Sequence, residues 1–547
     1  MNKFFLILFF STLIIISNKD FKYFRCATDK LDITPLNFNF TEKEEKRRLA
    51  VDYSTIKIGV DYASFSKPDS MSDDSYNKIK SLIEETITEF QKFLKVQHTE
   101  IDLSGQDESI KKTCQINAID GYFVNNFKNN DVVIFPTFNS ELDEDELSAA
   151  KLCLTNGNRP RPIAGVIQLN PNINMNLNNA DAFIKKILFH EITHILVFDK
   201  NLLRQLGLLT TKNSKPYITS TKVLSKIKRH FSCSTLSGLP FEDQDFKGNS
   251  PGSHWDARYM LGDYMIPLFY SDMVLSDITL ALFEDTKFYK VDYYSGGLFK
   301  FGKNKGCNFI NKNCIVNKQS SYDEFCTSFE TPLCTNSRIT KSYCIINDYI
   351  RYNITIPSKY RYFDNPNQGG YFYADFCPVP EAPNSDTDYL QYNCKFGSSS
   401  LPLEYGEEMS DTSFCFVSSL TPSSYENNVT FRSMCYKTEC HKDTLQIIVY
   451  VGGSTFICPT NGGIISGTGF KGVLTCPKYY EICDTESNQL CNDMFDCLSK
   501  KIEVSDDSFN MTTNTTFDRY IPIISADKIK NNLFYSFALL IIIIFFN

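Results

Sequence analysis

Two histidines four residues apart, His190 and His194, lie in the apolar stretch FHEITHILVFD, and Glu191 directly follows the first of them. Residues four apart share one face of a helix, so both imidazoles can approach a single metal ion. Imidazole nitrogens are good ligands for zinc. A glutamate at the next position of the helix can accept a proton from a nearby water. The pattern predicts a hydrolytic zinc site with His190 and His194 as ligands and Glu191 as general base.

The alternative is that His190 and His194 are ordinary polar residues of an apolar helix whose hydrogen bonds are satisfied within the protein. With six histidines and 64 acidic residues in 547, such a pentapeptide is expected about 0.008 times by chance. The metal-site interpretation is therefore favoured.

The motif alone is incomplete, because a catalytic zinc takes three protein ligands and a water. The other histidines are His98, His230, His254 and His441. His98 precedes the motif at a charged helix end, and His441 lies in a cysteine-rich region. His230 and His254 are therefore the candidates for the third ligand.

The elements that must position the motif alternate between strand and helix. Residues 54–65 alternate apolar and polar positions as a half-buried strand does, and residues 73–96 carry apolar residues at helical spacing. Residues 131–138 and 162–171 predict two further strands, the second broken by Gly165.

The motif itself falls in a predicted helix over residues 178–198, which opens near Asn179 or Asp181. A strand, a helix, two strands and a helix with the motif indicate a mixed α/β amino-terminal domain.

Composition excludes some classes of protein. The chain is 42% hydrophobic and 14% aromatic, enough for a large core and more than one domain. Its formal charge is −8, with no basic stripe of the kind that nucleic-acid binders carry. We therefore expect no nucleic-acid partner.

Both ends of the sequence are apolar. Residues 1–20 have the layout of a secretory signal, and the run 533–546 resembles a signal for a glycosylphosphatidylinositol anchor, with Ser525, Ala526 and Asp527 as a candidate cleavage site. A tail-anchored helix is the alternative for the second run. We therefore expect a secreted or cell-surface protein that meets the membrane through a lipid anchor or this helix.

Cysteine usage supports the same compartment. Fifteen of the 19 cysteines lie between Cys307 and Cys497, where short β-like runs predict a disulfide-tied, β-rich region. The sequence also carries five sequons for N-glycosylation, at Asn39, Asn353, Asn428, Asn510 and Asn514.

The segment GSHWDARYMLGDYMIP (252–267) resembles the third-histidine region of the leishmanolysin family, metzincin zinc peptidases in which a long insertion separates the second and third ligands. The resemblance rests on Ser253, His254 and Trp255, and then on the Asp263 to Met265 element. It implies that His254 is the third zinc ligand and that Met265 forms the Met-turn. Further likeness extends over about residues 50–500, including 161–165, 276–293 and 301–307.

The resemblance implies an α+β fold: a metzincin-type zincin catalytic domain, with a twisted mixed sheet and an active-site helix, followed by an inserted central subdomain and a disulfide-rich domain. The expected organisation is a signal peptide (1–20), a pro-segment (21–50), the catalytic domain (51–200), the central subdomain with His254 and Met265 (201–330), a cysteine-rich domain (331–504), a glycosylated stalk (505–532) and a hydrophobic tail (533–547).

The segment FRCATDK resembles the family's pro-peptide element through Arg25, Cys26 and Asp29, although Phe24 and Thr28 replace its two histidines. A thiolate binds zinc well, so the resemblance implies that Cys26 silences a zymogen. Setting Cys26 aside leaves 18 cysteines, enough for nine disulfides, with Cys114 and Cys153 as a bridge in the catalytic domain.

One position departs from the family pattern. Val197 replaces the glycine that ends the active-site helix, and Lys200 stands where most metzincins place their third histidine. A β-branched residue resists the left-handed turn. We expect the helix to end differently, running on to Asp199 or Lys200.

The implied function is hydrolysis of peptide bonds in proteins by one zinc ion, with the substrate extended along an edge strand containing AGVIQL (164–169). The alternative is a surface adhesion or binding protein of the same ancestry that has lost catalysis. A purely structural zinc site is a weaker alternative, because such sites usually have four protein ligands.

Overall fold

The structure is a computed structural model. It describes residues 25–38, 53–99, 101–121, 129–175, 180–244, 252–270, 272–293, 299–320, 322–382, 392–395, 397, 399, 401, 405–425 and 429–483. These residues belong to one compact unit. The predicted signal, stalk and tail lie outside the described residues, and the predicted domain limits at residues 200, 330 and 504 stay predictions.

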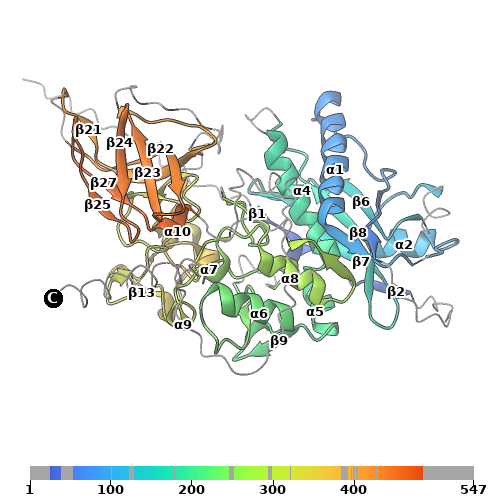
Figure 1. The fold of residues 1–547 in the computed structure, drawn as a ribbon. Coiled ribbons are helices and arrows are strands. Elements are labelled where there is room, and N and C mark those ends of the chain that lie inside the picture. The colour runs from blue at the N-terminus through green and yellow to red at the C-terminus, as the bar shows by residue number, and fades with distance from the viewer. Residues whose placement is uncertain are drawn as a thin grey trace, which may run out of the picture. The chain divides into compact units, whose positions relative to one another are not determined.

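A six-stranded mixed sheet forms the frame of the amino-terminal half (Figure 1). Its order is β1-β7-β8-β6-β4, and β2 also pairs with β7. Strand β7 runs antiparallel to β8, whereas the β8–β6 and β6–β4 pairs are parallel. The bounds are β1 (Arg25–Cys26), β2 (Leu36–Phe38), β4 (Ile58–Val60), β6 (Val132–Phe138), β7 (Glu146–Asn156) and β8 (Arg161–Leu169).

The position of β8 corrects two expectations. The AGVIQL segment lies in β8, between β6 and β7, so it is not an edge strand. Nor does Gly165 break this strand. A Cβ added at Gly165 would lie 2.5 Å from Cγ1 of Ile195, so the glycine lets the motif helix approach the sheet closely.

Alternate residues of β6 enter two different cores, as the pleat requires. Val132 and Ile134 join the main core, whereas Val133 and Phe135 join a smaller one. Helices α1 (Asp73–Phe93) and α4 (Ala180–Leu196) lie side by side against the main-core face (Figure 1). On the other face α2 (Asp107–Cys114) is tied to β7 by the Cys114–Cys153 disulfide, which confirms that predicted bridge.

Helix α1 is shorter than its apolar pattern predicts. It begins after Ser72, whose hydroxyl accepts a hydrogen bond from the Ser75 N–H at 3.1 Å. It ends at Phe93, and the chain continues as β5 (Leu94–Val96), which pairs with β3 (Ser54–Thr55) and β12 (Tyr289–Val291). The predicted strand over 54–65 is likewise divided, because β3 and β4 belong to different sheets.

The segment after α4 packs on the same core. It contains short helices and a small three-stranded sheet of order β11-β10-β9. The bounds are α5 (Lys200–Gln205), β9 (Leu209–Lys212), β10 (Lys215–Ile218), α6 (Thr221–His230), β11 (Leu239–Pro240), α7 (Ala257–Met260) and α8 (Asp277–Asp285).

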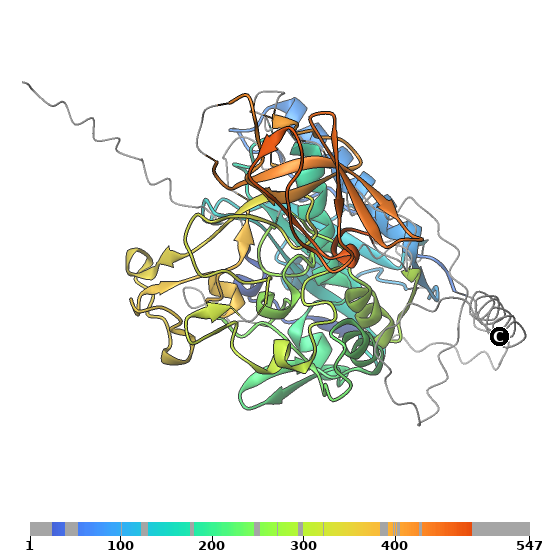
Figure 2. The ribbon, with the colours of Figure 1, turned by 60° about the vertical axis from the view of Figure 1, so that its left-hand side comes forward.

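The remaining chain is rich in short strands. Its last part forms a second six-stranded sheet, which is drawn in orange and red in Figures 1 and 2. That sheet has the order β24-β23-β22-β20-β27-β25. The bounds are α9 (Cys307–Asn311), β13 (Ile315–Val316), β14 (Gln319–Ser320), β15 (Pro332–Cys334), β16 (Lys341–Cys344), β17 (Asn347–Asp348), β18 (Gln368–Gly369), β19 (Pro380–Glu381), β20 (Ser413–Ser418), β21 (Thr421–Pro422), β22 (Arg432–His441), β23 (Gln446–Val451), β24 (Ser454–Cys458), β25 (Gly463–Ile465), β26 (Phe470–Lys471), β27 (Leu474–Cys476) and α10 (Tyr479–Ile482).

Disulfides hold this region together, as the cysteine count predicts. Beyond Cys233–Cys307, the structure forms Cys314–Cys377, Cys326–Cys344, Cys334–Cys415, Cys394–Cys435, Cys440–Cys483 and Cys458–Cys476.

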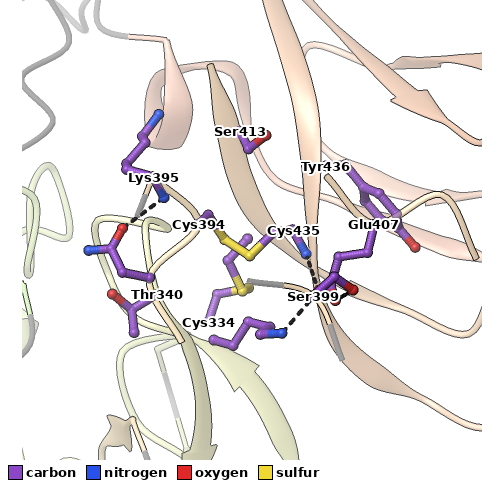
Figure 3. The surroundings of a disulfide bond; sticks show 12 residues. Cys334, Thr340, Cys394, Lys395, Ser399, Glu407, Ser413, Cys435 and Tyr436 are labelled. Atoms are coloured by element: carbon purple, nitrogen blue, oxygen red, sulfur yellow. Dashed lines mark hydrogen bonds and ion pairs between the residues drawn. A yellow bond between two sulfur atoms is a disulfide. The ribbon is translucent and has the colours of Figure 1, made fainter. Parts of the chain in front are cut away.

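Figure 3 shows one of these crosslinks, in which the Cys394–Cys435 bond lies beside Glu407. The Glu407 carboxylate accepts a hydrogen bond from the Cys435 N–H at 3.0 Å and pairs with the Lys341 ammonium at 3.1 Å. The mixed α+β class and the disulfide-rich region are thus confirmed.

Within the described ranges, no helix is both long enough and apolar enough to cross a membrane.

Candidate metal centre

Helix α4 carries the motif through the interior of the protein. From Lys186 to Leu196 every side chain is buried, and the helix packs on the sheet with α1 beside it. A helix that is apolar on most sides is expected to be buried. His190, Glu191 and His194 are therefore held almost free of solvent, with exposures of 1%, 0% and 1%.

Three imidazoles converge at one point. The Nε2 atom of His194 lies 3.0 Å from that of His190 and 3.1 Å from that of His254. His230 does not take part, because its Nε2 contacts the Phe301 carbonyl oxygen at 2.8 Å. Between the two candidates, the structure therefore brings His254 to the motif.

The other nitrogen of each ring has its own partner. The Nδ1 of His190 contacts the Tyr264 carbonyl oxygen at 2.7 Å, and that of His194 contacts the Phe198 carbonyl oxygen at 2.9 Å. A carbonyl oxygen only accepts, so these two Nδ1 atoms carry the protons and both Nε2 atoms present lone pairs.

This arrangement fits a metal ion. Burial lowers the pKa of His190 to about 3 and that of His254 to about 4, so both rings are neutral at physiological pH. Lone pairs that face one another at about 3 Å repel unless a cation lies between them. Three neutral imidazole nitrogens are the donor set that zinc prefers in a catalytic site.

The third imidazole is oriented by a buried carboxylate. Nδ1 of His254 lies 2.8 Å from Oε2 of Glu242, and the Glu242 N–H donates to the His254 carbonyl at 3.0 Å. Burial, and then the charge of Asp243, raises the pKa of Glu242 well above its usual range. Sequence analysis missed Glu242, because no fixed spacing relates it to His254.

Glu191 lies beside the histidines within a set of hydroxyl groups. Its Oε1 accepts a hydrogen bond from the Ser148 hydroxyl at 2.5 Å, and its Oε2 accepts one from the Thr28 hydroxyl at 3.3 Å. Burial raises the pKa of Glu191 to about 7, while these hydroxyl groups oppose the rise. A carboxylate with that pKa can both take and return a proton near neutral pH.

Cys26 completes the cluster. Its Sγ lies 3.5 Å from Nε2 of His194, and the four potential ligand atoms of Cys26, His190, His194 and His254 all lie within 4.8 Å of one another. Among the described cysteines, Cys26 is the one outside a disulfide. Burial, and then the charge of Glu191, raises the pKa of its thiol well above the usual range.

The backbone around Cys26 is fixed on two sides. Its N–H donates to the Pro267 carbonyl at 3.3 Å, and the next N–H, of Ala27, donates to the Ser148 carbonyl at 2.8 Å. The preceding Arg25 guanidinium pairs with Asp145 at 2.9 Å and with Glu146 at 2.7 Å. Residues 25–27 therefore bridge β7 and the segment that follows Met265.

The segment with Met265 is buried and packs against α4. Met265 is fully buried, its N–H donates to Oδ1 of Asp263 at 2.8 Å, and its carbonyl accepts from the Trp255 N–H at 2.9 Å. The hydroxyl groups of Tyr264 and Thr193 are 2.9 Å apart. The turn thus links α4 to the strand-like segment that carries His254.

Helix α4 ends without a glycine, because Val197 stands where the family pattern has one. The helix stops at Leu196, and both Val197 and Phe198 donate their N–H groups to the Thr193 carbonyl. Val197 is not among the residues with positive φ. The helix does not run on, because Asp199 instead caps α5 by accepting from the N–H groups of Asn201 and Leu202.

The mixed fold and the buried histidine cluster place the protein in the class of α+β proteins whose imidazoles can hold a metal ion. The leishmanolysin family model matches residues 52–489. The chain therefore belongs to the leishmanolysin family, which confirms the resemblance seen in the sequence.

Individual relatives are distant. Leishmanolysin of Leishmania major is 26% identical over 428 residues, which cover 74% of this chain and 68% of that protein. Leishmanolysin of Leishmania donovani is 28% identical over 341 residues, covering 59% of this chain and 56% of that protein. The leishmanolysin-like peptidase of Drosophila melanogaster is 26% identical over 309 residues, covering 49% of this chain and 44% of that protein.

Proposed function

We propose that this protein is a zinc metalloendopeptidase, with one zinc ion held by His190, His194 and His254. The observation that carries the proposal is the convergence of three Nε2 atoms beside a buried glutamate. Membership of the leishmanolysin family supports it, as does the similarity to leishmanolysin and to a leishmanolysin-like peptidase.

A zinc ion bound by these residues would supply Lewis acidity, which makes water a usable nucleophile near neutral pH. Glu191 takes the proton of the attacking water and later gives it to the leaving amine. Ser148 orients the Glu191 carboxylate through the 2.5 Å hydrogen bond. Met265 and its turn position the helix and take no part in the chemistry.

The substrate would lie along β7. In the structure β1 and β2, which lie within the predicted pro-segment, occupy this edge, with β1 paired to Glu146 and Ser148. Once they leave, β7 presents free backbone groups to which an extended peptide can add by β-strand pairing. In this proposal β7 is the substrate-binding edge strand, in place of the AGVIQL strand, which lies inside the sheet.

The chain would be made as a zymogen. The Cys26 sulfur occupies the place beside His194 that a reacting water needs, and Thr28 of the same segment contacts Glu191. We expect the protein to be secreted or on the cell surface, which the eight disulfides of the described region support. The lipid anchor stays a prediction from the sequence.

The decisive experiment compares the processed protein with its Glu191→Gln variant. Zinc content should stay at one ion per chain in both, whereas peptide cleavage should fall by about 10²- to 10⁴-fold in the variant, because the general base is lost. A chelator should remove the activity of the unmodified protein, and added zinc should restore it. If the processed protein holds zinc but cleaves no peptide library, the adhesion alternative is favoured instead.

A further inference from the structure

The sequon at Asn353 lies on a short turn that the backbone holds firmly. Asn353 directly follows the single 3₁₀ turn η4 (Tyr349–Tyr352) and is in the left-handed conformation, with φ of 54° and ψ of 35°. The Asp348 side chain accepts a hydrogen bond from the Ile350 N–H at 3.1 Å, and the Asn353 N–H donates to the Ile350 carbonyl at 3.0 Å. Asparagine is one of the residues that tolerate a left-handed backbone. The turn therefore presents the Asn353 side chain from a defined position.

The two side chains that define this sequon are open to solvent. Asn353 and Thr355 are both exposed, and neither side chain makes a hydrogen bond within the described residues. The turn is anchored instead by its neighbours, because Ile356 is 0% exposed and the buried Tyr349 donates its hydroxyl to the Gly370 carbonyl at 2.6 Å. A sugar on Asn353 would therefore displace no hydrogen bond of the fold.

Exposed apolar side chains gather beside the sequons. Ten large apolar side chains of the described residues are exposed, and five of these lie within three residues of a sequon asparagine. Those five are Leu36 before Asn39, Ile350 and Tyr352 before Asn353, and Val429 and Phe431 after Asn428. Few described residues lie so close to a sequon, namely residues 36–38, 350–356 and 429–431. Apolar exposure is thus concentrated where a sugar could cover it.

The exposure is large at the Asn353 turn. Ile350 is 63% exposed and Tyr352 is 41% exposed, three residues and one residue before the asparagine. The Tyr352 ring lies beside that of the buried Tyr349, with centroids 6.0 Å apart. Apolar surface left in water is unfavourable, and neighbouring exposed apolar side chains often mark a surface that something else covers.

We propose that Asn353 carries an N-linked glycan whose first sugars cover Ile350 and Tyr352. The first sugar of such a glycan is an N-acetylglucosamine, and one face of its ring is rich in C–H groups. Such a face can lie on the side chain of Ile350 or on the electron-rich face of the Tyr352 ring. The rest of the glycan extends into solvent and adds a bulky polar surface.

The modification is a glycosyl transfer within the secretory pathway. The donor is an oligosaccharide joined to a polyprenyl diphosphate. Nδ2 of Asn353 forms a bond to the anomeric carbon of the first sugar, and the bond from that carbon to the diphosphate oxygen breaks. The diphosphate leaves with the bonding electron pair, and Nδ2 releases one proton. The proposal needs passage through this pathway, which the eight disulfides support, but it does not depend on the proposed peptidase function.

Mass spectrometry of the full chain, secreted from a eukaryotic host, tests the modification. A peptide:N-glycosidase in heavy-oxygen water converts a glycosylated asparagine to labelled aspartate, and trypsin then releases residues 352–359, which contain this sequon alone. Labelled aspartate is expected at position 353. Recovery of unlabelled asparagine there would overturn the proposal. Labels at other sequons of the same sample would then show that the chain had still been secreted through the glycosylation pathway.

A matched pair of variants separates the sugar from the side chain that directs it. Thr355→Ala destroys the sequon and keeps Asn353, whereas Thr355→Ser keeps the sequon. Only Thr355→Ala should lose the label at position 353. Its thermal midpoint should lie about 1–2 °C below that of Thr355→Ser, because Ile350 and Tyr352 lose their cover.

A cycle with Tyr352→Ala tests whether the sugar packs on the turn. In that background the difference in thermal midpoint between the two Thr355 variants should fall to about half or less, since one of the covered side chains is gone. Tyr480→Ala is the control background, because Tyr480 lies on α10 and is similarly exposed, at 37%. There the difference should stay unchanged. Equal differences in all backgrounds would contradict the packing of the glycan on Tyr352.

Discussion

Each imidazole of the centre is fixed by the partner of its second nitrogen, and these partners differ in kind. His190 and His194 use backbone carbonyls, which any sequence provides, whereas His254 uses the Glu242 side chain. The His190, Glu191 and His194 positions could be predicted, since their spacing reflects helix geometry. The Glu242 position could not, because tertiary contacts alone bring it to His254.

Glu242→Gln should weaken zinc binding by about 10- to 100-fold, because the carboxyl group that orients the His254 ring and tunes its basicity is lost. Competition with a chromogenic zinc chelator measures the affinity. Glu330→Gln, at an exposed position, is the control and should bind as the unmodified protein does. An unchanged affinity for Glu242→Gln would show that the hydrogen bond to His254 does not tune the centre.

Glu381 should make stability depend on pH. It is buried, its Oε1 accepts from the Tyr371 hydroxyl at 3.1 Å, and burial raises its pKa to about 8. The proton is held more tightly in the folded state, so this stabilising contribution is complete below about pH 4.3, the unfolded value, and is lost as pH rises through about 8.

Glu381→Gln imitates the protonated side chain and should remove this dependence. Thermal midpoints of the two proteins should be close at about pH 5 and should differ in favour of the variant at about pH 9. A constant difference between these pH values would contradict the pKa shift.

At the scale of elements, the close contact between α4 and β8 determines how closely the helix with the histidine motif approaches the sheet. Four elements were predictable: α1 and α4 from helical spacing, and β6 and β8 from their apolar runs. Strand β7 was not predicted, because every one of its side chains is buried and its sequence ELSAAKLCLTN shows no alternation. Two of its three partners, β1 and β2, come from residues 25–38, far away in sequence.

Gly165→Ala should destabilise the protein by about 1–3 kcal/mol, since the new methyl group would lie 2.5 Å from Ile195. Combined with Ile195→Ala, it should cost less than the sum of the two single substitutions, because the shorter side chain makes room for the methyl group. Gly121→Ala is the control, because nothing lies within 4 Å of its added Cβ. Denaturant unfolding measures five proteins: the unmodified protein, the two single variants, the double variant and the control. Additive effects of the pair would contradict a direct clash.

At the scale of the whole molecule, one core runs from Ile56 to Val379, so segments from both halves of this range build the histidine centre. For this reason residue type and position alone could not decide whether His230 or His254 is the third ligand. Only the family resemblance favoured His254, and the structure brings it to the motif from 60 residues away.

Cys26→Ala should give an unprocessed chain that already cleaves peptides, because the sulfur no longer occupies the place beside His194. The activity should still be below that of the processed protein, since β1 and β2 continue to cover β7. Cleavage of a fluorogenic peptide, with processing checked by mass spectrometry, measures the effect. If the unprocessed variant stays as inactive as the unmodified precursor, the thiol is not the inhibitory group.

The pairing of β1 and β2 with β7 has a consequence for biosynthesis. Without that cover, an 11-residue strand would expose its backbone donors and acceptors along one side, and such a border is a template on which other copies can stack. If residues 25–38 are the inhibitory pro-segment proposed above, the same segment would therefore also protect the newly made chain from aggregation until it is removed.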